Sequence, residues 1–430
     1  MELSVDQVLA LAPDAASAAA GRKLMAARNW EGAGRTERAL WGLCRGSAVY
    51  QIRIDLVTFG YKCSCPSRKF PCKHVLGLLL LAASSPGELA AAEPPEWVAD
   101  WLAKRSEKAE KQAAAAPAEG EAAEPERKPV DAKAKARRAA QREGRITAGL
   151  EQLDLFLADC IRGGLAGLEA RPASFWQQQA ARLVDAQAPG IAGRVSALAE
   201  IPGSGRDWPA RLLAELGAVQ LLSEAWRRFE ELPEEMQSEL RQLVGMNLTA
   251  LEVTAAGETV EDVWCVVAQR IEPEDRVTVQ RSWLAGRESG RRGLVLQFAP
   301  GKQPFAETIV PGTEQRGALT FYPGTSRLRA RWNERRSAAV PFSEPPPGWE
   351  TIEAFLEAAA ELLARRPWAA DCGCVLHNAR LVPGEPLWHV LDAAGVAAPL
   401  AGSEHWRLLA LRGGEPHTLG AMIDGVFWPL

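Results

Sequence analysis

Alternating apolar and polar residues near the start of the chain predict a small antiparallel hairpin. Within residues 48–56, the apolar side chains from Tyr50 to Ile54 fall on one face of an extended chain, and mostly polar residues fall on the other. Residues 40–43 form a second apolar run, and the segment around Gly46 between the two runs has the composition of a tight turn. We therefore expect two paired strands here.

A period of three to four residues predicts helices on both sides of this hairpin. Residues 72–84 are rich in Leu and Ala, which predicts a buried helix that ends before Ser85. Shorter helices are expected over residues 13–27 and 96–105. The same period continues through residues 146–250 and predicts a separate helical domain.

Beyond residue 250 the period of the apolar pattern returns to two. Strand-like runs, separated by Gly, Pro and charged turns, are expected at residues 263–268, 277–284, 294–298, 319–322 and 328–332. A helix is expected at 352–363, and three further strand-like runs follow at residues 387–391, 406–411 and 421–427. We expect an α+β domain with an antiparallel sheet over residues 251–430.

The segment between the N-terminal elements and the helical domain has a different composition. Residues 103–145 contain no aromatic residue, and residues 106–132 consist mainly of Ala, Glu, Lys and Pro, which predicts a disordered linker. The basic stretch 133–145 is interpreted as a solvated lead-in to the next helix, with a nucleic-acid-binding arm as the alternative. The predicted fold class is α+β multidomain. It comprises a small β-hairpin/helix module (1–102), this linker (103–145), a helical domain (146–250) and an antiparallel-sheet α+β C-terminal domain (251–430).

Charge is distributed unevenly, although the formal net charge of the whole chain is only −4. Residues 1–80 hold 11 basic and 6 acidic residues, a net charge of +5, whereas the residues after 145 hold 27 basic and 36 acidic ones, a net charge of −9. The front of the chain could attract an anion and the back would not. No apolar run reaches the roughly 18 residues that span a membrane, and the first residues lack a basic n-region. We expect a cytoplasmic protein without membrane association.

The strongest chemical signal is a cluster of Cys and His residues. Cys63, Cys65 and Cys72 fall within ten residues and His74 follows, which in a cytosolic chain favours a metal over a disulfide. In an extended segment Cys63 and Cys65 share a face, and the two prolines of the intervening loop can fold it back so that Cys72 and His74 close the site. Three thiolates and a neutral imidazole fill all four positions of tetrahedral Zn²⁺, which predicts a structural site and argues against hydrolysis.

Four cationic residues surround this cluster: Lys62, Arg68, Lys69 and Lys73. They would offset the charge of the zinc–thiolate site, and they are also candidate contacts with nucleic acid or a protein partner. An alternative for the cluster itself is a catalytic pair of Cys65 and His74, but no acid lies nearby in sequence to orient the imidazole.

A second, weaker cluster lies in the C-terminal domain and comprises Asp371, Cys372, Cys374 and His377. Cys372 and Cys374 would share a face of a strand, but a second Cys pair is missing. We interpret these cysteines as core residues, with a metal site as the alternative. Cys44 lies outside the zinc pattern and is interpreted as a buried strand residue.

The spacing Cys-x-Cys-x6-Cys-x-His before an apolar helix resembles the SWIM zinc finger. With residues 40–47 and the stretch 13–16, the resemblance to bacterial SWIM-finger proteins covers about residues 1–85. It implies that the zinc ligands are Cys63, Cys65, Cys72 and His74. It also implies a DNA-binding or protein–protein role, with MoxR-type ATPases and von Willebrand A proteins as companions.

The chain has no phosphate-binding loop, dinucleotide fingerprint, zinc-protease motif or nucleophile elbow, so we expect a non-enzymatic protein. We prefer a protein–protein adaptor, because the net charge of −9 after residue 145 repels phosphate. The alternative is nucleic-acid binding through the basic finger. A third hypothesis is an enzyme with a site in residues 251–430. The 15 tryptophans are interpreted as core residues rather than as a base-stacking surface.

Overall fold

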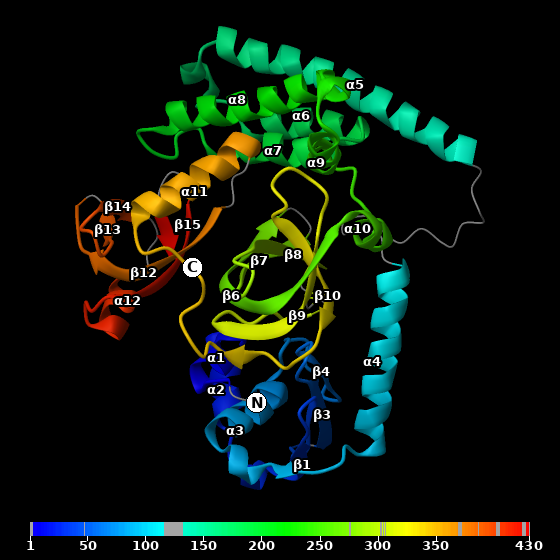
Figure 1. The fold of residues 1–430 in the computed structure, drawn as a ribbon, viewed down its shortest axis with the longest axis vertical. Coiled ribbons are helices and arrows are strands. Elements are labelled where there is room, and N and C mark those ends of the chain that lie inside the picture. Colours follow the sequence, from blue (N-terminus) through cyan, green and yellow to red (C-terminus); the bar gives the residue numbers. More distant parts are fainter. Residues whose placement is uncertain are drawn as a thin grey trace.

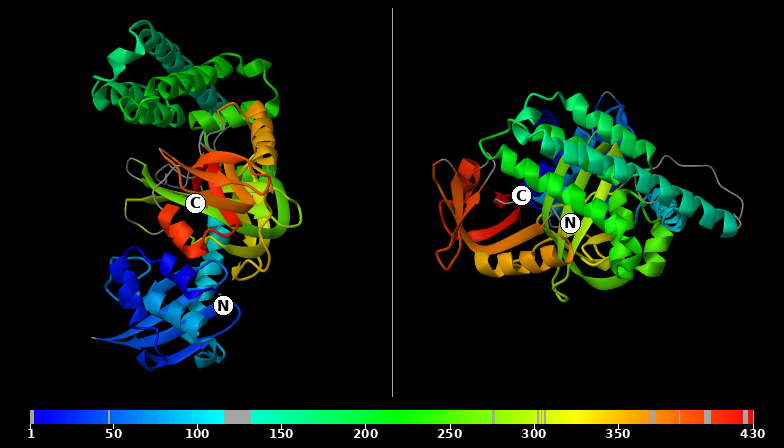
Figure 2. Two further views of the ribbon diagram at one scale, coloured as in Figure 1. Left: turned by 90° about the vertical axis from the view of Figure 1, so that its left-hand side faces the viewer. Right: turned by 90° about the horizontal axis from the view of Figure 1, so that it is seen from above.

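The computed structural model describes residues 3–46, 48–115, 132–274, 277–301, 303, 305, 307–368, 372–385, 387–400, 405–423 and 427–429. The N-terminal module, the first β-barrel and the helical domain follow one another along the longest axis of the molecule, and the second β-barrel lies beside the first (Figures 1 and 2). The fold is mixed α and β, as predicted.

The N-terminal module is a five-stranded sheet with helices on both faces. Its elements are α1 (Val5–Ala10), α2 (Ala15–Arg22), β1 (Trp30–Arg35), β2 (Ala39–Arg45), β3 (Val49–Asp55), β4 (Gly60–Cys63), α3 (Lys73–Ser84) and β5 (Ala90–Ala91). The strand order is β4-β3-β2-β1-β5. The predicted hairpin is confirmed, with Leu40 opposite Ile54, and both pack in the core that α3 completes. Cys44 is fully buried in β2, as expected.

Helix α4 (Glu96–Ala115) covers the opposite face of this sheet. Val98 packs against Ala39 and Trp41, whereas their neighbour Leu40 faces α3. The guanidinium of Arg53 lies over Trp97, with its carbon 5.5 Å from the ring centroid. This contact fixes the start of α4 on the sheet.

The helical domain contains five α-helices: α5 (Ala132–Arg162), α6 (Ala173–Asp185), α7 (Pro189–Ala197), α8 (Trp208–Arg227) and α9 (Glu234–Val244). The predicted apolar stripe is buried from Ile146 to Leu157, and it packs against Trp176 and Leu212. Pro209 occupies the first turn of α8, where a missing backbone N–H costs nothing. A short helix, α10 (Ala250–Ala256), leads out of the domain.

The predicted linker 103–145 needs a correction. Residues 106–115, predicted as disordered, continue helix α4. Residues 133–145, interpreted as a lead-in to the next helix, are helical and belong to α5. The Ala, Glu and Lys residues in the composition that predicted disorder are also among the strongest helix formers. The middle of the predicted linker lies outside the described residues.

The first barrel consists of β6 (Glu258–Glu274), β7 (Val277–Gly286), β8 (Arg292–Pro300), β9 (Thr313–Phe321) and β10 (Arg329–Arg335), with β11 (Val340–Pro341) at the edge of β9. The long β6 pairs with β9 along its first half and with β7 along its second half. Strand β10 pairs in parallel with β8 and antiparallel with β9, which closes the ring.

The second barrel follows helix α11 (Ile352–Arg365). It consists of β12 (Cys372–Val382), β13 (Trp388–Leu391), β14 (Ala397–Leu400), α12 (His405–Arg412), β15 (His417–Ile423) and β16 (Phe427–Pro429). Its closed order is β12-β13-β14-β16-β15, with β14 and β16 parallel. Helix α12 connects the third and fourth strands.

Both barrels therefore share one strand order, 1-2-3-5-4-1, with strands 3 and 5 parallel. This is the order of the OB-fold, a five-stranded Greek-key barrel. The predicted α+β region over 251–430, rich in antiparallel strands, is confirmed, but its strands form two barrels and each barrel contains one parallel pair. The run 406–411, predicted as a strand, is helix α12.

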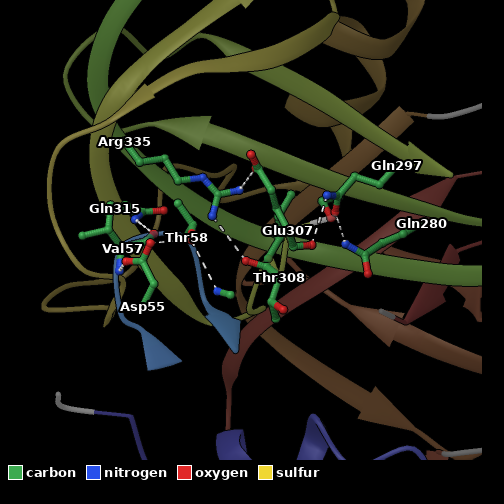
Figure 3. Close-up of polar contacts among 12 residues, drawn as sticks. Asp55, Val57, Thr58, Gln280, Gln297, Glu307, Thr308, Gln315 and Arg335 are labelled. Carbon is green, nitrogen blue, oxygen red and sulfur yellow. Dashed lines mark hydrogen bonds and ion pairs between the residues drawn. The ribbon is translucent and has the colours of Figure 1, made fainter. Parts of the chain in front are cut away.

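The N-terminal module docks on the first barrel through specific contacts. The Gln315 amide donates to the Val57 carbonyl at 2.7 Å, and the Gln7 amide donates to the Gly312 carbonyl at 3.0 Å. Val310 of the barrel lies in the same apolar core as α3. Figure 3 shows this junction, where the tip of the module reaches the polar network of the barrel. The module and the barrel share a continuous interior.

Candidate metal centre

Strand β4 and helix α3 bring the four predicted ligands together. Cys63 is the last residue of β4, opposite Ile52 of β3, and Cys72 is the N-cap residue of α3, one residue before its first turn. His74 lies in that turn and Cys65 in the connecting loop. The four ligand atoms all lie within 4.8 Å of one another, and Cys63 Sγ is 3.8 Å from His74 Nδ1.

This spacing fits a tetrahedral zinc ion. Zinc–sulfur and zinc–nitrogen bonds of about 2.3 and 2.0 Å place tetrahedral ligand atoms about 3.5–3.8 Å apart. The observed atoms therefore need to converge by no more than about 1 Å to hold the ion. Because the donors are thiolates and an imidazole, they suit zinc rather than magnesium or calcium, which prefer oxygen.

The electrostatics of the cluster also favour a cation. A hydrogen bond from Cys63 lowers the pKa of the Cys72 thiol to about 4; contacts from His74 and the Val75 backbone N–H add to this effect, and burial opposes it. The same interaction with Cys72, together with burial, raises the pKa of Cys63, and burial raises the pKa of Cys65. A divalent ion would displace the protons that these two thiols retain.

A closed site of this kind is structural. All four positions around the ion would be filled by protein atoms, so no position remains for a reactive water. Cys72 and His74 are buried, and the ring of Tyr50 covers His74 at 4.7 Å between centroids. Cys65 and His74, considered above as a catalytic pair, are both members of the four-ligand cluster.

Two family models match the chain. The SWIM zinc finger matches residues 50–83, which include the whole cluster, and the SWIM-associated four-helix bundle domain matches residues 141–244, which run from α5 to α9. The chain is a SWIM-domain protein. Comparison with curated proteins and with solved structures gave no match. Within the described residues, no helix has the length and apolarity to cross a membrane.

The four cations predicted as contacts all lie exposed around the SWIM finger. Lys69 binds Asp14 at 2.7 Å, and this contact is the main reason that the pKa of Asp14 is lowered to about 2. Lys62, Arg68 and Lys73 form no ion pair within the described part of the chain. Their charges therefore remain available on the surface of the finger.

Sequence reasoning missed Phe70, which lies in the same loop. Its side chain is 48% exposed, although phenylalanine side chains are usually buried. The available signal was its position between Lys69 and Pro71 in the loop that joins the ligands. An exposed aromatic ring among cations is a combination found in nucleic-acid-binding surfaces.

The second cysteine cluster is only partly described. Cys372 pairs with Ile423 and Cys374 with Ala421 through the backbone of β12 and β15. Asp371 and the two cysteine side chains lie outside the described residues. The His377 ring is 3.2 Å from the Thr418 hydroxyl, so one of its nitrogens is already engaged.

Proposed function

We propose that this SWIM-domain protein is a non-enzymatic protein that binds single-stranded nucleic acid, with the zinc-stabilised finger as one contact surface. The observation that carries this proposal is the finger loop 64–71 between β4 and α3, where Phe70 is exposed beside Arg68. Lys62 lies at the end of β4 and Lys73 at the start of α3, and within the described residues none of these three cations has an ion pair. The strand order of both barrels supports it, since OB-type barrels commonly bind oligonucleotides.

The balance of charges around the zinc site supports binding of an external ligand by these cations. Three thiolates, a neutral imidazole and Zn²⁺ leave the site with one negative charge. Lys69 is neutralised by Asp14, so Lys62, Arg68 and Lys73 exceed what the site requires. This excess favours an external anion, and Phe70 would stack on a base.

Salt dependence of binding tests this proposal. Fluorescence anisotropy with a labelled oligothymidylate should show affinity that falls steeply between about 50 and 300 mM salt. Replacing Lys62, Arg68 and Lys73 with Ala should reduce the slope of log K against log salt by about 2, because each phosphate contact contributes about 0.7 on single strands. Phe70→Ala should weaken binding about tenfold by removing a stacked base.

Arg206→Ala serves as the matched control, since Arg206 is exposed on a loop of the helical domain. It should leave both the affinity and the slope unchanged. Binding that is absent, or that does not respond to salt or to the finger substitutions, would contradict nucleic-acid binding by the finger.

A protein–protein adaptor is the second candidate, and the barrel surface favours it. Several of its arginines are paired with acids, as in Arg316 with Glu288 at 2.9 Å and Arg291 with Glu258 at 3.0 Å. Such a neutralised surface attracts phosphate weakly. We propose a MoxR-type ATPase or a von Willebrand A protein as the partner, on the family resemblance. Mass spectrometry of the native complex after nuclease treatment tests this role: a protein partner that persists would favour the adaptor.

We also propose that the resident metal is zinc and that the protein works in the cytoplasm. A reducing compartment keeps Cys63, Cys65 and Cys72 as thiols that can bind the metal.

A further inference from the structure

A cavity of about 520 Å³ lies between the first barrel, α11 and the second barrel. The first barrel contributes residues of β7 and β8 and the loop 322–328 between β9 and β10. In the OB-type strand order, these are the second and third strands and the loop between the fourth and fifth strands. They are the parts with which OB-fold barrels bind oligonucleotides and oligosaccharides.

The wall of this cavity is apolar and partly aromatic. Trp283 comes from β7, Trp349 precedes α11, and Phe355, Ala359 and Leu362 come from α11 itself. Phe355 and Trp349 meet edge to face with their centroids 5.0 Å apart. A flat aromatic ligand could pack against such a wall.

The polar residues of the cavity are mainly cationic: Arg291, Arg292, Arg327 and Arg365 line it. Glu235 is the acid found among the described lining residues, and it binds Arg327 at 2.8 Å. Arg291 and Arg327 are also held by Glu258, at 3.0 and 3.2 Å, and Arg292 and Arg365 are the other cations beside the apolar walls. A low-dielectric wall strengthens the attraction of such charges for an anion.

Two of these arginines are placed to receive an anion. Arg292 lies over the Trp349 ring at 4.3 Å and donates to the Pro347 carbonyl at 2.7 Å, so its guanidinium is held at the aromatic wall. Arg365 is exposed at the end of α11 and has no ion pair within the described residues.

We propose that this cavity binds one nucleotide unit, with its base against the aromatic wall and its phosphate at Arg292 and Arg365. The cavity volume lies within the range of about 300–1,000 Å³ that is usual for small-molecule sites. The unit comes either as a free mononucleotide or as part of a single strand, and the chemistry of recognition is the same for both. The site does not depend on the finger loop.

Calorimetric titration of the zinc-loaded full chain tests the proposal. Thymidine monophosphate and a short oligothymidylate are the two ligands, and thymidine and inorganic phosphate are the single-component controls. Both nucleotide ligands should bind through the cavity, and each control at least about tenfold more weakly. Tighter binding of the monophosphate would identify a free nucleotide as the ligand, and tighter binding of the oligomer would identify a single strand as the ligand.

Two pairs of variants place the binding in the cavity. Ala358→Leu fills the recess from α11 and should weaken monophosphate binding at least about tenfold, whereas Ala360→Leu, exposed on the same helix, should not. Arg365→Ala should weaken it about tenfold through loss of a charged hydrogen bond, whereas Arg206→Ala should not.

Three results would overturn the proposal. The first is no monophosphate binding at millimolar concentration, and the second is equal binding of inorganic phosphate. The third is a loss of monophosphate binding on replacing Lys62, Arg68 and Lys73, which would move the site to the finger. Because these finger variants leave the cavity intact, failure of the finger proposal and failure of the cavity proposal are distinguished.

Discussion

At the scale of single residues, buried charges in the barrel are held by several donors at once. Glu314 of β9 accepts hydrogen bonds from Arg287 Nε at 3.1 Å and from the Ser343 hydroxyl at 2.9 Å. Burial alone would raise the pKa of Glu314, but the hydrogen bonds from Arg287 and Ser343 outweigh it and hold the pKa below its ordinary value. The ionised form is therefore the stable one in the folded barrel.

Glu314→Gln should lower the free energy of unfolding by about 2 kcal/mol near neutral pH, because charged hydrogen bonds are lost. A carboxyl whose folded pKa is depressed contributes stability above its unfolded pKa of about 4.3, and this stability is lost as the pH falls through the folded value. The difference between wild type and variant should thus shrink on acidification.

Urea unfolding at about pH 7, 5 and 3 measures this difference. Glu353→Gln, exposed in the first turn of α11, is the control and should behave like the wild type. A difference between wild type and Glu314→Gln that does not change with pH would contradict the role assigned to this carboxylate.

The residues that sequence could identify were those whose chemistry depends on local spacing. Cys63, Cys65, Cys72 and His74 lie within twelve positions, so a strand end, a loop and a helix start suffice to bring them together. The partners of Glu314 come from two distant segments, so no local pattern predicts them.

At the scale of elements, the buried carboxylate of Glu239 joins helix α9 to the loop before β10 and to the segment after α11. Glu239 of α9 accepts from the Thr325 backbone N–H at 2.9 Å, in the loop before β10. It also binds Arg366 at 2.7 Å and the Trp368 indole at 3.4 Å, just after α11. Glu239 therefore anchors the helical domain to the barrels, beside contacts such as Arg327 with Glu235 at 2.8 Å and the Gln242 amide with the Pro323 carbonyl at 2.7 Å.

Glu239→Ala should destabilise this joint by about 3 kcal/mol, because it leaves the half-buried Arg366 guanidinium without its partner. Thermal unfolding followed by calorimetry measures the loss. Glu230 is exposed and lies just before α9, so Glu230→Ala is the control and should change the midpoint temperature of unfolding little. Equal midpoints for the two variants would show that Glu239 does not anchor the domain.

Element type could be predicted where the apolar pattern was long, and not where it was short. The apolar residues from Ile146 to Leu157 recur every three or four positions over several turns, a period that fits a helix and not a strand. The run 406–411 is too short for its period to distinguish helix from strand, and its Leu, Ala and Arg content favours the helix that forms.

At the scale of the whole molecule, the finger and the first barrel fold against each other. The buried Gln315 amide donates to Val57 in the finger module and to Ser337 in the barrel, at 2.7 and 2.6 Å. Gln315→Ala would leave both carbonyls without this donor, at a cost of about 1–3 kcal/mol.

Hydrogen exchange of residues 50–83 should therefore speed up in Gln315→Ala, while the zinc content stays the same. Gln152→Ala, exposed on α5, is the control and should leave exchange unchanged. Exchange in Gln315→Ala that matches the wild type would mean that the two parts are coupled elsewhere.

The closure of the barrels could not be predicted from sequence. It depends on parallel pairs such as Arg329 with Leu294 and Leu400 with Phe427, which join segments separated by other strands. Local alternation predicts that a strand forms, but it does not predict which strand becomes its neighbour. Only the three-dimensional pairing revealed the OB-type order and the cavity beside it.

The central claim is that a closed zinc site holds the N-terminal module together, and elemental analysis of the purified full chain tests it most directly. We predict one zinc ion per chain, lost in Cys72→Ser together with protection of residues 50–83 from exchange, and kept in Cys44→Ala, whose sulfur lies outside the ligand set. Less than about half an equivalent of zinc, in a protein whose residues 63–74 remain protected, would contradict the account.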